Sequence, residues 1–155
     1  SVRQYLFYKQ GSLKSVTLPD NIKYISDYAF NGCYRLVLSL PDGVISIGSG
    51  ACKEVKISKL PKKLQTIRSN AFAYCSSFQD LEIPELVKEI GYDAFNQCEN
   101  LSTVTFAGTP SSVSATAFEN CAKLATINVP WAEGAVKNAP WSAKNATINY
   151  NYTGE

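Results

Sequence analysis

The sequence contains no histidine and carries little net charge. Without histidine, neither a Ser-His nor a Cys-His catalytic pair can form. Fifteen basic and thirteen acidic residues leave a net charge of +2, which is too small to indicate a nucleic-acid or anionic-membrane partner. No apolar run approaches the length of a bilayer span, and no signal peptide is visible. The first residue is not Met, so we expect a mature or excerpted chain.

The composition is that of an ordered protein. Hydrophobic residues make up 45% of the 155 positions and charged residues 18%, proportions typical of a globular chain and not of a disordered one. A chain of this length can bury a sizeable core within one domain.

An internal repeat dominates the sequence. The segment ISDYAFNGC, residues 25–33, returns as IRSNAFAYC, IGYDAFNQC and VSATAFENC. A less regular copy, IGSGACKEV, has Cys52 in place of the Phe and Val55 in place of the final Cys. The alanines that align these copies are separated by 22, 20, 23 and 23 residues, and they are Ala29, Ala51, Ala71, Ala94 and Ala117. A period of this size is typical of a solenoid.

Each unit begins with a short stretch in which apolar and polar residues alternate: VTLP, LSLP, LEIP, VTFA or INVP. This alternation predicts a short strand with one buried face, which the proline ends because it cannot donate to a ladder. A second extended piece follows, as in NIKYI, KLQTI and LVKEI, and then a turn that places Ala and Phe inward. One unit cannot cover its own apolar residues, whereas stacked units can, so we predict a curved parallel solenoid of roughly six coils.

The pattern Leu-x-x-Val/Ile-x-Leu-Pro followed by Ile-x-x-x-Ala-Phe-x-x-Cys-x-x-Leu resembles the BspA-like (Treponema-type) leucine-rich repeat of bacterial surface proteins. The resemblance covers nearly everything from Leu13 to Pro130. It implies a leucine-rich repeat solenoid, mainly β, with short parallel strands and helical turns. The segment VPWAEGAVKNAPWSAKNATI resembles the end of such domains, which implies a short C-terminal capping helix. It also implies a location outside the cell or on the bacterial cell surface.

We therefore expect one solenoid domain over residues 1–155. Residues 1–12 are expected to form an incomplete first coil or N-terminal edge, residues 13–130 the repeats, and residues 131–155 a cap and tail. Tyr5, Phe7 and Tyr8 belong to the incomplete coil, and Trp131 and Trp141 are expected to close the opposite end. The pair Thr109-Pro110 departs from the repeat, which makes the regularity of its coil uncertain.

The cysteines allow three interpretations: buried thiols, disulfides or a metal site. Each regular cysteine lies three residues after an inward Phe, where a thiol acts as a small apolar side chain. Disulfides between coils are disfavoured because equivalent Cβ vectors run parallel and the count of five is odd. Zinc is disfavoured because a ladder with steps of this length does not converge. The favoured interpretation is a set of structural core cysteines: Cys33, Cys52, Cys75, Cys98 and Cys121.

A catalytic role is disfavoured, and no cofactor is expected. Asp80 and Glu82 share one strand face and could in principle form a carboxylate pair. Two carboxylates at i and i+2 of an exposed strand more often form a solvated face. The stretch SIGSGACK lacks the spacing of a phosphate-binding loop. We therefore predict that the domain is not an enzyme.

Two surfaces are candidates for binding. The outward positions of the strands form a polar platform, of a kind that repeat proteins use for recognition, although short polar residues also simply suit a solvent-facing strand. Its residues are Ser15, Thr17, Ser39, Asp80, Glu82, Thr103, Thr105, Thr126 and Asn128. A basic segment could contact an acidic partner or a polysaccharide, although charge runs are usually solvated. Its residues are Lys53, Lys56, Lys59, Lys62, Lys63 and Arg68.

Two functions remain open from the sequence. The first is an extracellular interaction or adhesion module that presents its strand face to an unknown protein or glycan. The second is a structural segment that spaces other domains of a larger surface protein and has no ligand of its own. The sequence does not distinguish them, and it leaves the oligomeric state open.

Overall fold

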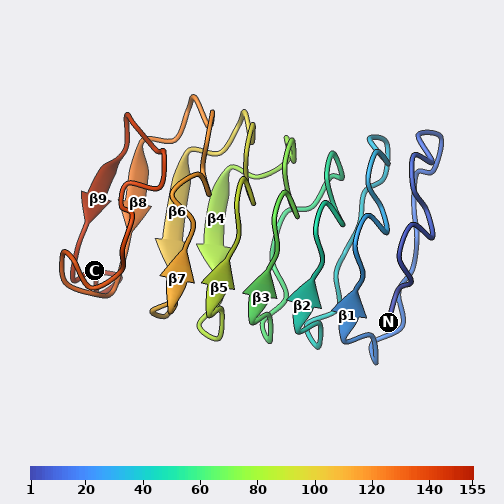
Figure 1. Cartoon of the computed structure of the whole chain (residues 1–155), viewed down its shortest axis with the longest axis horizontal. Coiled ribbons are helices and arrows are strands. Elements are labelled where there is room, and N and C mark those ends of the chain that lie inside the picture. Colours follow the sequence, from blue (N-terminus) through green and yellow to red (C-terminus); the bar gives the residue numbers. More distant parts are fainter.

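The computed structural model describes residues 1–155, which form one row of stacked coils with the two termini at opposite ends (Figure 1). All strand pairs are parallel, and they form two sheets. The five-stranded sheet contains β1 (Tyr24–Ile25), β2 (Ser46–Ile47), β3 (Thr66–Ile67), β5 (Glu89–Ile90) and β7 (Ser112–Val113). The four-stranded sheet contains β4 (Asp80–Ile83), β6 (Thr103–Phe106), β8 (Thr126–Asn128) and β9 (Thr147–Asn149). The predicted parallel solenoid is confirmed.

The five-stranded sheet shows how two residues per coil suffice to build a ladder. In every strand the first side chain points outward and the second is buried. The buried side chains pair in register from coil to coil: Ile25, Ile47, Ile67, Ile90 and Val113. Because identical positions contact each other, an apolar residue at this position in one coil is covered by its equivalents above and below.

The four-stranded sheet is regular only in the C-terminal half of the chain. In the N-terminal half the equivalent segments are reduced to isolated bridges between Ser15 and Val37 and between Val37 and Lys56. The pairing of Lys56 with Val37 places Val55 level with Leu36. Val55 therefore takes the place of both the cysteine and the leucine of a regular coil, and this coil is three residues short. No strand pairing connects Lys56 with β4.

The turns that follow the five-stranded sheet are not helical, which corrects the helical turns implied by the resemblance. They are built from i→i+3 hydrogen bonds, such as Ala29 N to Ser26 O and Cys33 N to Phe30 O. Two positions in these turns recur with positive φ, and Tyr28 and Gly32 occupy them in the first full coil. A residue in the left-handed region breaks a right-handed helix, so the chain makes successive turns instead.

The predicted C-terminal capping helix is also wrong. Residues 131–146 form a series of turns closed by i→i+3 bonds, among them Trp141 N to Asn138 O and Ala143 N to Pro140 O. Gly134 and Asn138 have positive φ, and Pro140 has no N–H to donate, so a helix cannot continue through them. The chain then returns to the solenoid, because Ile148 of β9 pairs with Ile127 of β8.

The core is one cluster of buried side chains that extends along the whole stack. Phenylalanine rings stack at the Ala-Phe position: Phe95 lies 5.5 Å from Phe72 and 5.4 Å from Phe118 between ring centroids. Phe7 stacks on Phe30 at 5.2 Å, and Val2 pairs with Ile25, so residues 1–12 occupy the positions of an incomplete coil. The smaller Cys52 separates the two groups of stacked rings.

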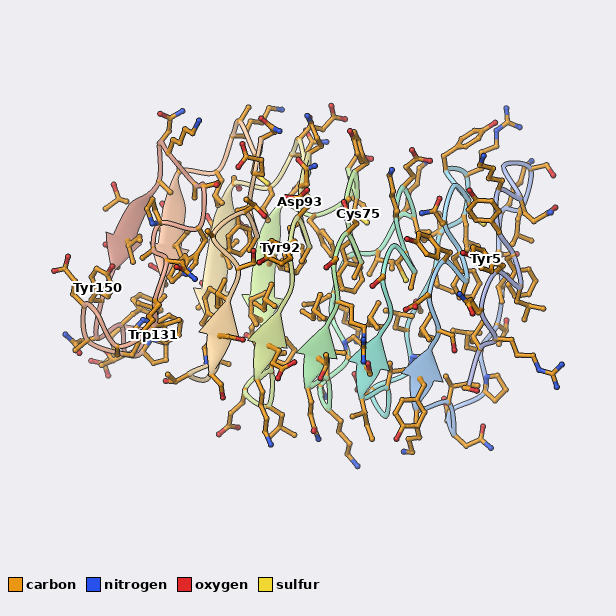
Figure 2. The ribbon with its side chains drawn as sticks, in the orientation of Figure 1. Tyr5, Cys75, Tyr92, Asp93, Trp131 and Tyr150 are labelled. Carbon is orange, nitrogen blue, oxygen red and sulfur yellow. The ribbon has the colours of Figure 1, made fainter.

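Two tryptophans close the C-terminal end, as Figure 2 shows for Trp131. Trp131 and Trp141 are both buried and lie 5.1 and 6.0 Å from the ring centroid of Phe106. Trp141 Nε1 donates to the Lys137 carbonyl, whereas the buried Nε1 of Trp131 has no acceptor. At Gly108, beside the irregular Thr109-Pro110, a Cβ would clash with the Glu85 carbonyl oxygen. Glycine is therefore required there for the two coils to stack.

Substitution of Phe95 by Ala should reduce the free energy of unfolding by about 3–5 kcal/mol, since Phe95 is fully buried and contacts rings on both sides. Urea unfolding followed by circular dichroism would measure this loss. Phe7→Ala serves as the matched control, because Phe7 is only partly buried and stacks on a single ring. Equal losses for both variants would contradict the ladder as a source of stability.

Candidate binding faces

The outward side chains of the four-stranded sheet form two rows. Asp80 pairs in register with Thr103, and Thr103 with Thr126, so these three predicted residues lie side by side in the first row. The second row brings together Glu82, Thr105 and Asn128 in the same way. Of the remaining predicted residues, Ser15, Thr17 and Ser39 lie beyond the break in pairing, nearer the N-terminus.

The second row is joined by its own hydrogen bonds. Asn149 Nδ2 donates to Asn128 Oδ1 at 2.8 Å, and Asn128 Nδ2 donates to Thr105 Oγ1 at 3.1 Å. Asn128 is only 7% exposed, which corrects its expected role as a contact residue. It supports the row from within instead. The hydroxyls of Thr103 and Thr126 make no hydrogen bond within the chain, in contrast to Thr105 of the second row.

Sequence reasoning missed the last strand of this face. β9 adds Thr147 next to Thr126 and Asn149 next to Asn128. The signal was present, because ATIN occurs at residues 125–128 and again at residues 146–149. It was hidden by the irregular cap between the two copies. Val37 was also missed, although it is 63% exposed beside Ser15.

The six basic residues are distributed around the coil. Lys53 lies in a turn, with Nζ 5.2 Å from the ring centroid of Tyr74. Lys56 lies on the strand face, and Lys62 pairs with Asp42 at 3.6 Å. Arg68 follows β3 on the other sheet. Lys63 is exposed beside Lys62 at the turn between the two sheets.

Acidic residues face part of this basic segment. Lys59 and Lys62 line a shallow hollow together with Asp42, Asp80 and Glu82. The structure therefore places charges of both signs at this position, and the positive charges do not form one continuous patch.

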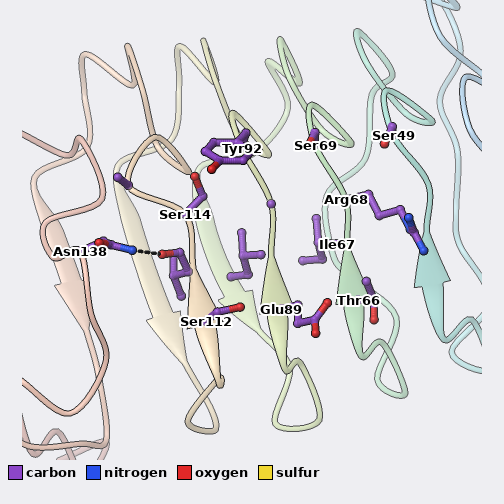
Figure 3. A pocket seen from close by; sticks show the side chains of 14 residues that line it. Ser49, Thr66, Ile67, Arg68, Ser69, Glu89, Tyr92, Ser112, Ser114 and Asn138 are labelled. Atoms are coloured by element: carbon purple, nitrogen blue, oxygen red, sulfur yellow. Dashed lines mark hydrogen bonds between the residues drawn. The ribbon is translucent and has the colours of Figure 1, made fainter.

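A hollow of the surface lies on the five-stranded sheet (Figure 3). We call it the small-sheet groove, because each strand of this sheet has only two residues. It has a volume of about 630 Å³ and is lined by fourteen residues from the ends of β3, β5 and β7 and the loops beside them. Hydroxyl side chains dominate its lining: Ser49, Thr66, Ser69, Ser112 and Ser114. Arg68, Glu89, Tyr92 and Asn138 complete the polar side chains of the groove.

Of these residues, the sequence predictions included only Arg68, and for a different reason. The groove residues come from the positions on either side of the buried Ile or Val of each coil. In a single coil such residues look like ordinary turn residues. Only the stacking of β3, β5 and β7 places them next to one another.

The cysteine thiols are hydrogen-bonded across the stack. Cys33 Sγ lies 3.0 Å from the Phe7 carbonyl oxygen, and Cys98 and Cys121 contact the carbonyls of Phe72 and Phe95 in the same way. These three thiols thus donate to the carbonyl at the Phe position of the preceding coil, and Cys75 donates to Cys52, which occupies that position; Cys52 itself makes no such bond. Sequence reasoning treated the thiol only as a small apolar group and missed this donor function.

All five cysteines are free and buried. Burial raises the pKa of the Cys33, Cys52 and Cys75 thiols above the usual value, because the charged thiolate would lose its hydration. Nowhere do three or more cysteine, aspartate or glutamate side chains converge as they would to hold a metal ion. The cysteines therefore belong to the core, and the groups that a partner could reach lie on the two sheets.

These features define a class of protein, a parallel β-solenoid of the leucine-rich repeat type. Residues 1–125 match six copies of the family described as BspA type leucine rich repeat region, and the chain belongs to this family. It is a family of repeat scaffolds and not a class of enzymes. The structure has no helix that could cross a membrane.

Two solved structures of bacterial proteins are similar to the chain. The T. pallidum leucine rich repeat protein is 31% identical with a TM-score of 0.68, over 90% of this chain and 70% of that one. A leucine rich cell surface protein of Faecalibacterium prausnitzii is also 31% identical, with a TM-score of 0.65. That match covers 77% of this chain, which spans about a third (33%) of the Faecalibacterium protein. A comparison with curated proteins gave no match.

Because the thiols are buried, we expect the stability of the folded chain to depend on pH, and substitution of one cysteine can measure its share of this effect. Above about pH 8.5 the unfolded chain ionises its cysteines, whereas burial keeps Cys75 protonated in the folded chain. The folded state then binds more protons than the unfolded state, so stability falls as the pH rises. We expect wild type to lose stability relative to Cys75→Val between pH 8 and 10, but not between pH 6 and 8.

Urea unfolding of both chains in reductant, at each pH, would measure the difference. The exposed Lys56→Val variant serves as the control for a general effect of substitution. A constant difference between wild type and Cys75→Val across the whole pH range would show that Cys75 ionises equally in both states.

Proposed function

We propose that the chain is an interaction module of a bacterial surface or secreted protein, and that it holds a protein or glycan partner on its four-stranded sheet. The observation that carries the proposal is the first outward row of that sheet. Asp80, Thr103, Thr126 and Thr147 lie in register on four neighbouring strands, and the three threonine hydroxyls make no hydrogen bond within the chain.

The second row, which lies beside the first, is joined by hydrogen bonds. The adjacent bonds from Asn149 to Asn128 and from Asn128 to Thr105 fix the neighbouring side chains. A surface that is already ordered loses less conformational entropy when it binds. The similarity to the Faecalibacterium cell surface protein supports a location outside the cell. The depth of the cysteines and the absence of histidine favour binding over catalysis.

The proposal is tested by screening the labelled domain against a glycan array and a panel of extracellular matrix proteins. Thr126→Arg places a long charged side chain in the middle of the row, between Thr103 and Thr147. We expect it to weaken any saturable binding by about tenfold or more, as for a residue at the centre of an interface. Titration by biolayer interferometry would give the affinity.

Ala122→Arg is the matched control, because Ala122 is exposed in a turn outside the row and the change in charge is the same. Equal affinity of Thr126→Arg and Ala122→Arg would remove the strand face from the binding site. A screen that finds no saturable ligand would favour the alternative function, a spacer without a ligand of its own.

A further inference from the structure

We propose that the small-sheet groove is a second, separate binding site, and that it takes a neutral oligosaccharide. The groove lies on the five-stranded sheet, whereas the proposed interaction row lies on the four-stranded sheet. It extends from Ser49 beside β2 to Asn138 beyond β7. With neighbouring strands about 4.8 Å apart, the strands from β2 to β7 span roughly 14 Å, a length suited to a short chain of sugar rings.

The floor of the groove cannot recognise a ligand through its backbone. The N–H groups of Arg68, Gly91 and Ser114 donate to the carbonyls of Ile47, Ile67 and Ile90, each in the preceding coil. Because β3 and β5 are paired on both sides, a peptide cannot join them as an added strand. Recognition in the groove must therefore come from side chains.

The side chains of the groove are mostly free hydroxyls. Those of Ser49, Thr66, Ser69 and Ser112 make no hydrogen bond within the chain, unlike Ser114, which contacts Thr116 Oγ1 at 3.4 Å. A hydroxyl both donates and accepts, and so does each hydroxyl of a sugar. A row of such groups at regular spacing complements a polymer whose hydroxyls also recur at regular spacing.

Tyr92 supplies an aromatic surface among these hydroxyls. It is 69% exposed, and its ring has no aromatic or cationic partner in the chain, in contrast to Tyr28, which stacks on Tyr5. The equivalent residues in the neighbouring coils are the small Ser69 and Ala115, so space is left on both sides of Tyr92 (Figure 3). An exposed ring with a polar hydroxyl at its tip fits the apolar face of a sugar ring and the hydroxyls at its rim.

The charges of the groove select a neutral ligand. Arg68 is its only cation and Glu89 its only anion, and neither forms an ion pair. A polyanion would gain one contact with Arg68 and meet repulsion from Glu89, so nucleic acids and sulfated polysaccharides are disfavoured. The guanidinium of Arg68 can donate to, and the carboxylate of Glu89 can accept from, the uncharged hydroxyls of a sugar in charge-assisted hydrogen bonds. The ligand class that satisfies all these groups is a neutral oligosaccharide.

The test uses the whole chain with maltohexaose, cellohexaose, mannohexaose and N-acetylchitohexaose as probes, and heparin as the anionic comparison. Isothermal titration calorimetry would give affinities, and saturation-transfer NMR would detect weak binding. We expect at least one neutral probe to bind. Comparison of N-acetylchitohexaose with the other neutral probes distinguishes glycans of the cell-wall type from plain glucans and mannans.

Tyr92→Ala should lower the affinity by about tenfold, because it removes the stacking surface. Ser69→Trp should weaken binding at least as strongly, because the large side chain fills the groove without removing a charge. Tyr34 is another exposed tyrosine and lies outside the groove, so Tyr34→Ala should leave the affinity unchanged. Thermal melting of each variant would confirm that it is folded.

The proposal would be overturned if no neutral probe binds, whether or not heparin does, or if binding survives both Tyr92→Ala and Ser69→Trp. The strand-face variant Thr126→Arg separates this proposal from the proposed function. Oligosaccharide binding through the groove should persist in Thr126→Arg, and loss of binding there would place the sugar on the other sheet. A partner of the strand face should likewise still bind Tyr92→Ala.

Discussion

The stacking of equivalent residues in register is the constraint on which the rest of the structure depends. A coil of about two dozen residues cannot cover its own apolar side chains, and it becomes stable only when the next coil covers them. The column that runs from Ile25 through Ile67 to Val113 satisfies this requirement, and so do the stacked rings of Phe72, Phe95 and Phe118. Each coil therefore repeats the same inward residues, and variation is confined to the outside.

The cysteine position shows how closely the inward residues are specified. A thiol is small enough for the core and also donates to a carbonyl of the preceding coil, as Cys98 does to Phe72. Burial raises the pKa of Cys33, Cys52 and Cys75, and all five thiols are buried, so the recurrence of cysteine reflects packing and not reactivity. An irregular coil also changes how neighbouring coils pair. The shortened coil around Val55 ends one group of pairings, and the next begins only at β4, which divides the strand face.

Function depends on the outward side chains, which the stacking brings together without constraining their identity. On the four-stranded sheet this gives a flat row of threonines supported by asparagine hydrogen bonds. On the five-stranded sheet it gives a groove in which Tyr92 stands among serines and a threonine. The two faces differ because one coil segment is a longer strand with two outward residues, while the other has a single outward residue per strand.

The sequence by itself determined the repeat, the inward residues, the parallel solenoid and the family, because these follow from periodic burial within each coil. It also placed Asp80, Thr103 and Thr126 on one face, since alternation fixes the side of a strand. The tertiary structure alone decided which outward residues become neighbours. It joined β9 to β8 across an irregular cap, buried Asn128, dispersed the basic residues and assembled the small-sheet groove. These features depend on contacts between residues about twenty positions or more apart, which no local pattern in the sequence records.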